Sequence, residues 1–174
     1  SFNFINTKVE QSVSLPYYFN IDIDKELTFT PIFNYGGGVD SSQRLLGDYN
    51  QIISGGNLSL INTSIGDCWH INTKDKIVLI EDHQEKPYAI HRTLKYLARI
   101  GFFSEARGIV FGDFLAHPFS DDPAIQKQQE GYLEHVLNTF AKECAFPVLQ
   151  TPYVGHHQHN YAVSYQQDMV FEVL

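Results

Sequence analysis

The stretch KIVLIEDHQE, residues 76–85, decides how the rest of the chain is arranged. Its apolar part, residues 77–80, is β-branched at three of four positions. A short run of this kind is typical of a strand that is buried on both faces of a parallel or mixed sheet. The run stops at two adjacent carboxylates, Glu81 and Asp82. Because the sites of open α/β sheets form where strands end, Glu81 is a candidate for a rigid, partly desolvated site carboxylate. A solvated residue that ends the strand explains the position as well.

Downstream of this strand, helical patterns alternate with short apolar runs. One helix is predicted to begin near Pro87 and to end at Gly101, and a second begins after Asp122, which suits an N-cap followed by proline. Each helix precedes a predicted buried strand, at residues 108–112 and 146–149. Strand–helix–strand order at this spacing predicts right-handed βαβ crossovers. The carboxyl ends of these strands would then share one edge of the sheet.

Upstream of the decisive stretch, a pair of glycines stands before a short helical pattern. Gly55 and Gly56 permit positive φ or the close approach of another group, and Asn57 is a good N-cap for a helix over residues 58–65. Amides at such a helix start would suit a carboxylate or an oxyanion. A tight turn with a cap is the simpler explanation of the spacing. We nevertheless name Gly55, Gly56 and Asn57 as candidate substrate-binding residues.

The two ends of the chain are rich in strand patterns. Residues 27–30 alternate in polarity, and Pro31 favours an edge strand. Three glycines at residues 36–38 predict a plain loop, because no P-loop lysine follows them. Residues 169–173 are mostly apolar, and this pattern predicts a strand near the end of the chain. These patterns predict an α/β domain with a mixed, partly parallel sheet, a second layer of strands and two or three helices.

Length and charge limit the function. The chain has 174 residues, which suits one domain. It carries 20 acidic and 12 basic residues without a lysine or arginine cluster, which argues against nucleic-acid binding. No apolar run is long enough to cross a bilayer, so membrane insertion has no support. Cys68 and Cys144 are far apart and form no CxxC motif, which favours a reducing compartment over a disulfide scaffold.

A histidine cluster follows the third predicted strand. His156, His157 and His159 stand within four residues, downstream of a strand whose neighbours end near Glu81 and Asp113. Three interpretations remain open. A histidine with a carboxylate behind it is the base and orienting acid of a hydrolase. Histidines beside carboxylates can also hold zinc, and all three can be ordinary loop residues. A serine hydrolase further needs a nucleophile, and the G-x-S-x-G elbow is absent from this sequence.

Several blocks of the sequence, in order, resemble the C-terminal domain of the LD-carboxypeptidase family. This family of serine peptidases includes muramoyltetrapeptide carboxypeptidases and microcin C self-immunity peptidases. The matching blocks are residues 55–60 (GGNLSL), residues 77–82 (IVLIED), Tyr88, His91, Arg92, Leu94, Leu97, Gly101, residues 108–114 (GIVFGDF), and Gly155 and His156 with Asn160. The resemblance predicts the C-terminal domain over residues 46–174. Residues 1–45 match poorly and are predicted to be a segment that links two domains.

The resemblance implies a layered β/β/α fold and a two-domain enzyme whose N-terminal domain, absent from this chain, carries the serine. It implies that Glu81 is the orienting acid and His156 the general base. Family enzymes release a terminal D-amino acid, typically D-alanine of murein tetrapeptide, in the cytoplasm during wall recycling. No cofactor or metal is implied, the partners are an L,D-peptide substrate and the N-terminal domain, and a homodimer is left open. The isolated chain is expected to be inactive.

One departure from the family pattern and two other classes of function leave the assignment open. His157 stands where the family usually has a small residue, so either imidazole could face the serine. The domain could instead be a non-catalytic ligand-binding or regulatory module derived from the same fold. A zinc-dependent hydrolase that uses the cluster from His156 to His159 is the other alternative.

Overall fold

The computed structural model describes residues 2–5, 20–22, 27–33, 51–115, 118–156, 159–161, 163, 165 and 168–173. The predicted loop at residues 36–38, His157 and most of the predicted linking segment, residues 1–45, lie outside this set. Within it, the mixed α/β fold with a partly parallel sheet is confirmed.

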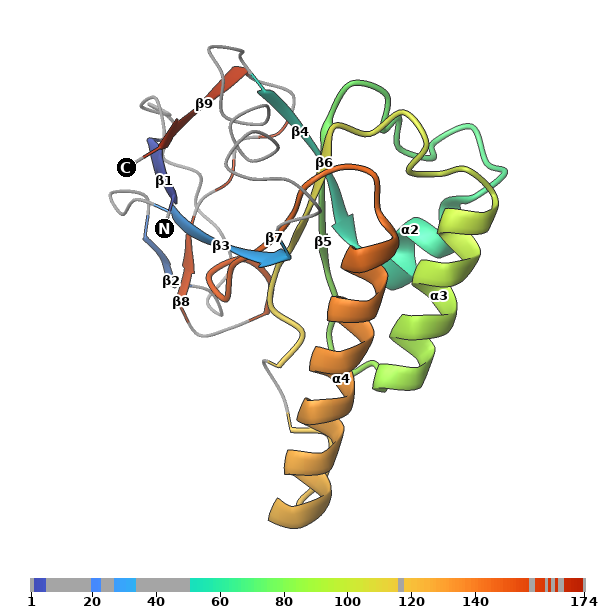
Figure 1. Cartoon of the computed structure of the whole chain (residues 1–174), viewed down its shortest axis with the longest axis vertical. Coiled ribbons are helices and arrows are strands. Elements are labelled where there is room, and N and C mark those ends of the chain that lie inside the picture. Colours follow the sequence, from blue (N-terminus) through green and yellow to red (C-terminus); the bar gives the residue numbers. More distant parts are fainter. Residues whose placement is uncertain are drawn as a thin grey trace.

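Four parallel strands form one half of the sheet: β4 (Gln51–Asn57), β5 (Ile77–Glu81), β6 (Gly108–Phe111) and β7 (Val148–Gln150). The predicted strands at residues 77–80, 108–112 and 146–149 are confirmed, whereas β4 was not predicted, because its glycines suggested a tight turn. The four strands pair in this order, each parallel to the next (Figure 1). Because parallel neighbours cannot be joined by a tight hairpin, the chain crosses over between them through helices. The carboxyl ends of β4 to β7 therefore lie at one edge.

Antiparallel strands form the other half. They are β1 (Phe2–Ile5), β3 (Leu27–Phe33) and β9 (Asp168–Val173). β3 pairs with β7 and β9 pairs with β4, so the order β1-β3-β7-β6-β5-β4-β9 closes into a barrel. A separate pair of parallel strands, β2 (Asn20–Asp22) and β8 (His159–Tyr161), lies beside it. The second layer of strands expected from the sequence is thus the antiparallel wall of the barrel.

The prediction that Pro31 marks an edge strand is wrong. β3 has neighbours on both sides, β1 and β7. Pro31 lies opposite Leu149, and the register of the pairing shifts between Pro31 and Phe33. A proline has no N–H to donate to a ladder, and such irregularities are one place where a sheet accepts it.

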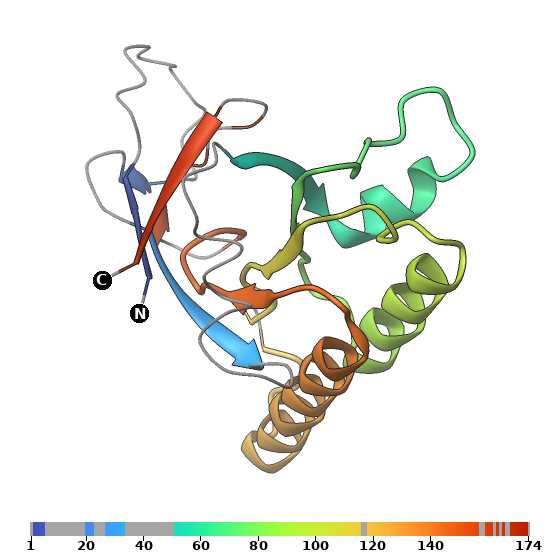
Figure 2. The same ribbon diagram turned by 45° about the horizontal axis from the view of Figure 1, so that its top comes forward.

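The helices cover one side of the parallel half. α2 (Leu58–Ser64), α3 (Pro87–Arg99) and α4 (Pro123–Glu143) lie together on this side (Figure 2). α4 also contacts the antiparallel strand β3. Their starts follow from the sequence as predicted, because Asn57 and Asp122 cap α2 and α4 and prolines open α3 and α4. Among the described residues, no helix combines the length and apolar character needed to cross a membrane.

Strand β5 is buried on both faces because its successive side chains enter different cores. Val78 and Ile80 join the core between the sheet and the helices, whereas Ile77 and Leu79 pack inside the barrel. Alternation of side chains along a strand requires this division. Each such side chain contributes roughly 1.5–3 kcal/mol when it is fully buried. The end of β5 is therefore held firmly from both sides.

Candidate active site

Two side chains from different strand ends meet at the carboxyl edge of the parallel half. Glu81 is the last residue of β5, and His156 lies in the loop after β7. The Nδ1 atom of His156 lies 2.7 Å from Oε2 of Glu81. A carboxylate at that distance accepts a hydrogen bond, so Nδ1 carries the hydrogen and Nε2 is the basic nitrogen of the ring.

The two partners differ in exposure. The side chain of Glu81 is 11% exposed and that of His156 is 33% exposed. Burial raises the pKa of Glu81 above its ordinary value, and the hydrogen bond from His156 opposes this shift. A carboxylate whose charge is poorly solvated interacts strongly with any positive charge that forms on the adjacent ring. The arrangement can therefore orient an imidazole and stabilise its protonated form.

Glycines let the loop with His156 approach the strand ends. A Cβ on Gly112 would lie 2.4 Å from the carbonyl oxygen of Val154 and 3.0 Å from Cβ of Glu81. Gly155 has φ of +140°, and a Cβ there would lie 3.1 Å from the carbonyl oxygen of Asp113. The N–H of Asp113 donates to the Val154 carbonyl across 2.6 Å. The loops after β6 and β7 thus pack backbone against backbone, which brings His156 to Glu81.

Asp82 has a different role from its neighbour Glu81. It is 3% exposed. Its carboxylate accepts hydrogen bonds from Nδ2 of Asn57 at 2.9 Å and from Oγ of Ser59 at 2.8 Å. It also accepts from the N–H groups of Ser59 at 3.1 Å and His83 at 2.8 Å. The anion expected at the start of α2 is therefore a carboxylate of the chain itself, which ties the β4–α2 turn to the end of β5.

The three candidate substrate-binding residues lie at this edge, with different local roles. A Cβ on Gly55 would lie 1.9 Å from the carbonyl oxygen of Leu79, so glycine is required there for β4 to pair closely with β5. Gly56 has φ of +142° and open space where a Cβ would lie. Asn57 caps α2 and contacts Asp82. Their contact with a substrate stays a prediction.

Two further polar residues at this edge were not predicted as site residues from the sequence. His83 stacks on His156, with ring centroids 4.5 Å apart and planes inclined by 28°. Asp113 was noted only as a strand end. It is 6% exposed, and its Oδ1 accepts from the N–H of Leu115 at 2.7 Å. The signal that could have found His83 is its place two residues after the candidate acid in EDH.

The zinc interpretation gains no support from the described part of the chain. No group of three or more histidine, cysteine, aspartate or glutamate side chains within it could hold a metal ion. His157 and the side chain of His159 lie outside the described residues. The two cysteines are free, and Cys144 lies in the hydrophobic core, where burial raises the pKa of its thiol to about 12.

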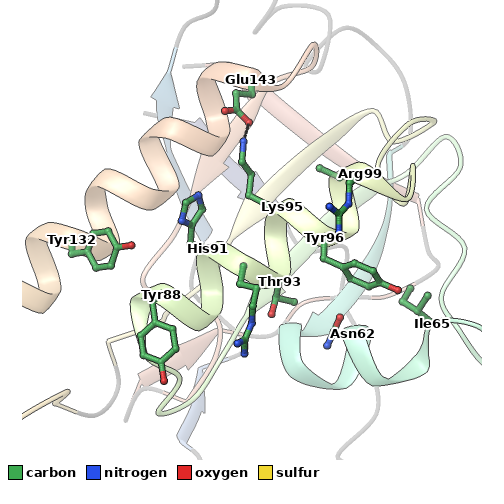
Figure 3. A pocket seen from close by; sticks show the side chains of 12 residues that line it. Asn62, Ile65, Tyr88, His91, Thr93, Lys95, Tyr96, Arg99, Tyr132 and Glu143 are labelled. Carbon is green, nitrogen blue, oxygen red and sulfur yellow. Dashed lines mark hydrogen bonds and ion pairs between the residues drawn. The ribbon is translucent and has the colours of Figure 1, made fainter.

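A groove on the helix layer is separate from this edge. Its volume is about 1150 Å³, and it runs along α3 between α2 and α4 (Figure 3). Long exposed side chains line it, among them Tyr88, Tyr96, Tyr132, Arg92 and Arg99. Neither Glu81 nor His156 belongs to its lining. This groove and the polar pair thus occupy different faces.

Comparison with known proteins connects this edge to a family. Residues 51–170 match the family model described as the LD-carboxypeptidase C-terminal domain. The chain is 33% identical over 116 residues to a putative carboxypeptidase of Rickettsia conorii, which covers 67% of this chain and 33% of that protein. It is 33% identical over 102 residues to a probable murein peptide carboxypeptidase of Bacillus subtilis, covering 59% of this chain and 30% of that protein.

Solved structures agree with this match. The muramoyltetrapeptide carboxypeptidase from Oxalobacter formigenes superposes with a TM-score of 0.54 at 25% identity, over 65% of this chain and 37% of that one. An MccF-like protein from Bacillus anthracis superposes with a TM-score of 0.53 at 19% identity, over 82% and 42% of the two chains, which shows likeness of fold alone. The chain spans about a third of the length of the curated relatives that it matches. It belongs to the LD-carboxypeptidase family of peptidases, in which it corresponds to the C-terminal domain.

Proposed function

We propose that this chain supplies the orienting acid, Glu81, and the general base, His156, of a serine LD-carboxypeptidase. The nucleophilic serine comes from a further domain of the same enzyme. The substrate is a murein tetrapeptide or a related L,D-peptide, and the released product is its terminal D-amino acid, D-alanine. The observation that carries the proposal is the 2.7 Å contact between Nδ1 of His156 and Oε2 of Glu81. Names of relatives that mention murein peptide and muramoyltetrapeptide support the class of substrate.

The reaction follows from the orientation of the imidazole. The serine oxygen attacks the scissile carbonyl carbon, and its proton passes to Nε2 of His156. The amide C–N bond then breaks, and the proton moves from Nε2 to the departing amine. Water attacks the resulting acyl-enzyme with the same nitrogen as base, which frees the serine. Glu81 holds the Nδ1–H tautomer throughout and stabilises the imidazolium that forms in both halves of the reaction.

The choice of a nucleophile outside this chain follows the family resemblance, and three of the described serines support it. The hydroxyl of Ser59 donates to Asp82, and the hydroxyls of Ser64 and Ser104 donate to the carbonyls of Ile61 and Gly101. These hydroxyls are used by the fold itself. The isolated 174-residue chain is therefore expected to be inactive. We place the reaction in the cytoplasm, where the family resemblance implies that recycled murein peptides are processed.

The test is an assay of D-alanine release by the full-length protein and its variants. Replacing His156 by Ala or Glu81 by Gln should lower kcat by about a thousandfold or more, because members of such a unit act together. His135→Ala is the matched control, since this histidine is exposed on helix α4, whereas the polar pair lies at the ends of the strands. Turnover near that of the wild type in either site variant would overturn the proposal.

The same assay distinguishes the remaining alternatives. His157→Ala should keep most of the activity, and a loss as large as that of His156→Ala would transfer the role of base to His157. Binding of the tetrapeptide by the full-length protein without release of D-alanine would make this domain a ligand-binding module. Loss of activity with a chelator, together with stoichiometric zinc, would favour the metal-dependent class.

A further inference from the structure

The main chain of His83 is held in place by a hydrogen bond at the end of β5. Its N–H donates to Oδ1 of Asp82 across 2.8 Å. Asp82 is 3% exposed and is also held by Asn57 and Ser59. A residue joined directly to such a buried, hydrogen-bonded carboxylate has little freedom to move away from the end of β5. The ring of His83 is therefore presented from a fixed point.

This ring covers one face of His156. The ring centroids are 4.5 Å apart, and the planes are inclined by 28°, which is an aromatic stack. The Nδ1 atom of His83 is buried. The hydrogen bond to Glu81 is a contact at one edge of the His156 ring. The stacked ring of His83 adds a contact on its face. The two contacts act in different directions and together restrain the orientation of the ring.

We propose that His83 is a positioning residue for His156, which stacks on its ring and keeps the plane in which Nδ1 meets Glu81 and Nε2 faces the reacting hydroxyl. This inference rests on the proposed function. Glu81 is the last residue of β5 and His83 follows it by two residues, whereas His156 comes from the loop after β7. The end of β5 therefore supplies both the in-plane and the face contact of the base.

The test is an NMR measurement on the imidazole groups of the 174-residue chain. His83→Phe keeps an aromatic ring for the stack, whereas His83→Ala removes it. His135→Ala is the control, as an exposed histidine on α4. Long-range ¹H–¹⁵N spectra report which nitrogen of His156 carries the hydrogen. Dispersed amide spectra establish that each variant is folded, and His83→Leu replaces His83→Ala if the latter does not fold.

We expect wild type and His83→Phe to hold the Nδ1–H tautomer of His156. In His83→Ala, both tautomers should be populated, and the Nδ1 hydrogen should exchange about tenfold faster or more, as the ring loses its restraint. A tautomer and an exchange rate in His83→Ala equal to those of the wild type would overturn the inference. Neither result depends on hydrolysis, so a full-length protein that fails to release D-alanine would refute the proposed function and leave this measurement intact.

Discussion

The strand-end region around Glu81 holds a polar pair, and the groove along α3 is a hollow in the surface. The two regions are built differently. At the strand ends, buried carboxylates have short contacts, and glycines bring backbones together. In the groove, long exposed side chains line about 1150 Å³ (Figure 3). Ion pairs there, such as that between Lys95 and Glu143, are about half exposed. The comparison teaches that candidate catalytic side chains are better recognised by their burial and hydrogen-bond partners than by the size of a nearby groove.

The largest expected effect comes from Gly55, at the strand-end region. Its Cβ as alanine would lie 1.9 Å from the Leu79 carbonyl oxygen, at φ of +139°. Gly55→Ala should therefore lower the free energy of unfolding by about 4 kcal/mol or prevent folding. Gly131→Ala is the matched control, because nothing lies within 4 Å of its Cβ and it is exposed in α4. It should raise stability by about 0.5–1 kcal/mol in urea denaturation. Equal stability of the two variants would contradict the close approach.

Asp82 gives the next effect. Removing its carboxylate leaves Asn57, the Ser59 amide and the His83 amide without their acceptor at the end of β5. Asp82→Ala should cost about 3 kcal/mol of unfolding free energy, because buried donors lose charge-assisted hydrogen bonds. The exposed Asp121→Ala should change stability by less than about 0.5 kcal/mol. A loss in Asp82→Ala no larger than in the control would show that the link between the β4–α2 turn and β5 is not required.

Glu81 should reveal its burial through pH. Burial raises its pKa, so the folded chain binds this proton more tightly than the unfolded chain. The resulting contribution to stability is present below the ordinary pKa and is lost as the pH rises through the raised value. The Glu81→Gln variant has no ionisable group at this position. It should resist urea better than the wild type near pH 7, and this advantage should be smaller at about pH 4. Urea denaturation across this range measures it, and an advantage that shrinks as the pH rises would contradict the sign.

The groove should give the smallest effect. Lys95 and Glu143 form an ion pair whose side chains are 45% and 51% exposed. Lys95→Ala should change the free energy of unfolding by less than about 1 kcal/mol and leave D-alanine release by the full-length protein unchanged. A loss of activity as large as that of Glu81→Gln would assign the groove a part in the reaction and would remove the contrast between the two regions.

Individual elements show how far the sequence could lead. The run at residues 77–80 predicted β5 with both faces buried, and the caps at Asn57 and Asp122 predicted the starts of α2 and α4. The edge assignment at Pro31 was wrong, because the local effect of proline does not reveal that β1 and β7 lie on either side. Ala98 continues the helical spacing of the buried Leu94 and Leu97 on α3 but is exposed.

The candidate site divides in the same way. Glu81 and His156 were predicted as partners through resemblance to a family, and the structure brings them together. The sequence carried no pattern that would put His83 on the face of His156. A histidine after two acidic residues is compatible with many ring orientations, and only the position of the loop after β7 selects the stack.

Local patterns of polarity, caps and glycines were sufficient to predict β5, β6, β7 and the starts of the helices, because these depend on residues that are close in the sequence. Closure of the barrel by β1, β3 and β9 and the contact across 75 residues between Glu81 and His156 required the tertiary structure. Such contacts depend on how separate loops pack at one edge, where backbone approach at Gly112 and Gly155 decides the position of the imidazole. Chemistry at this edge is thus a property of packing between segments that no single segment contains.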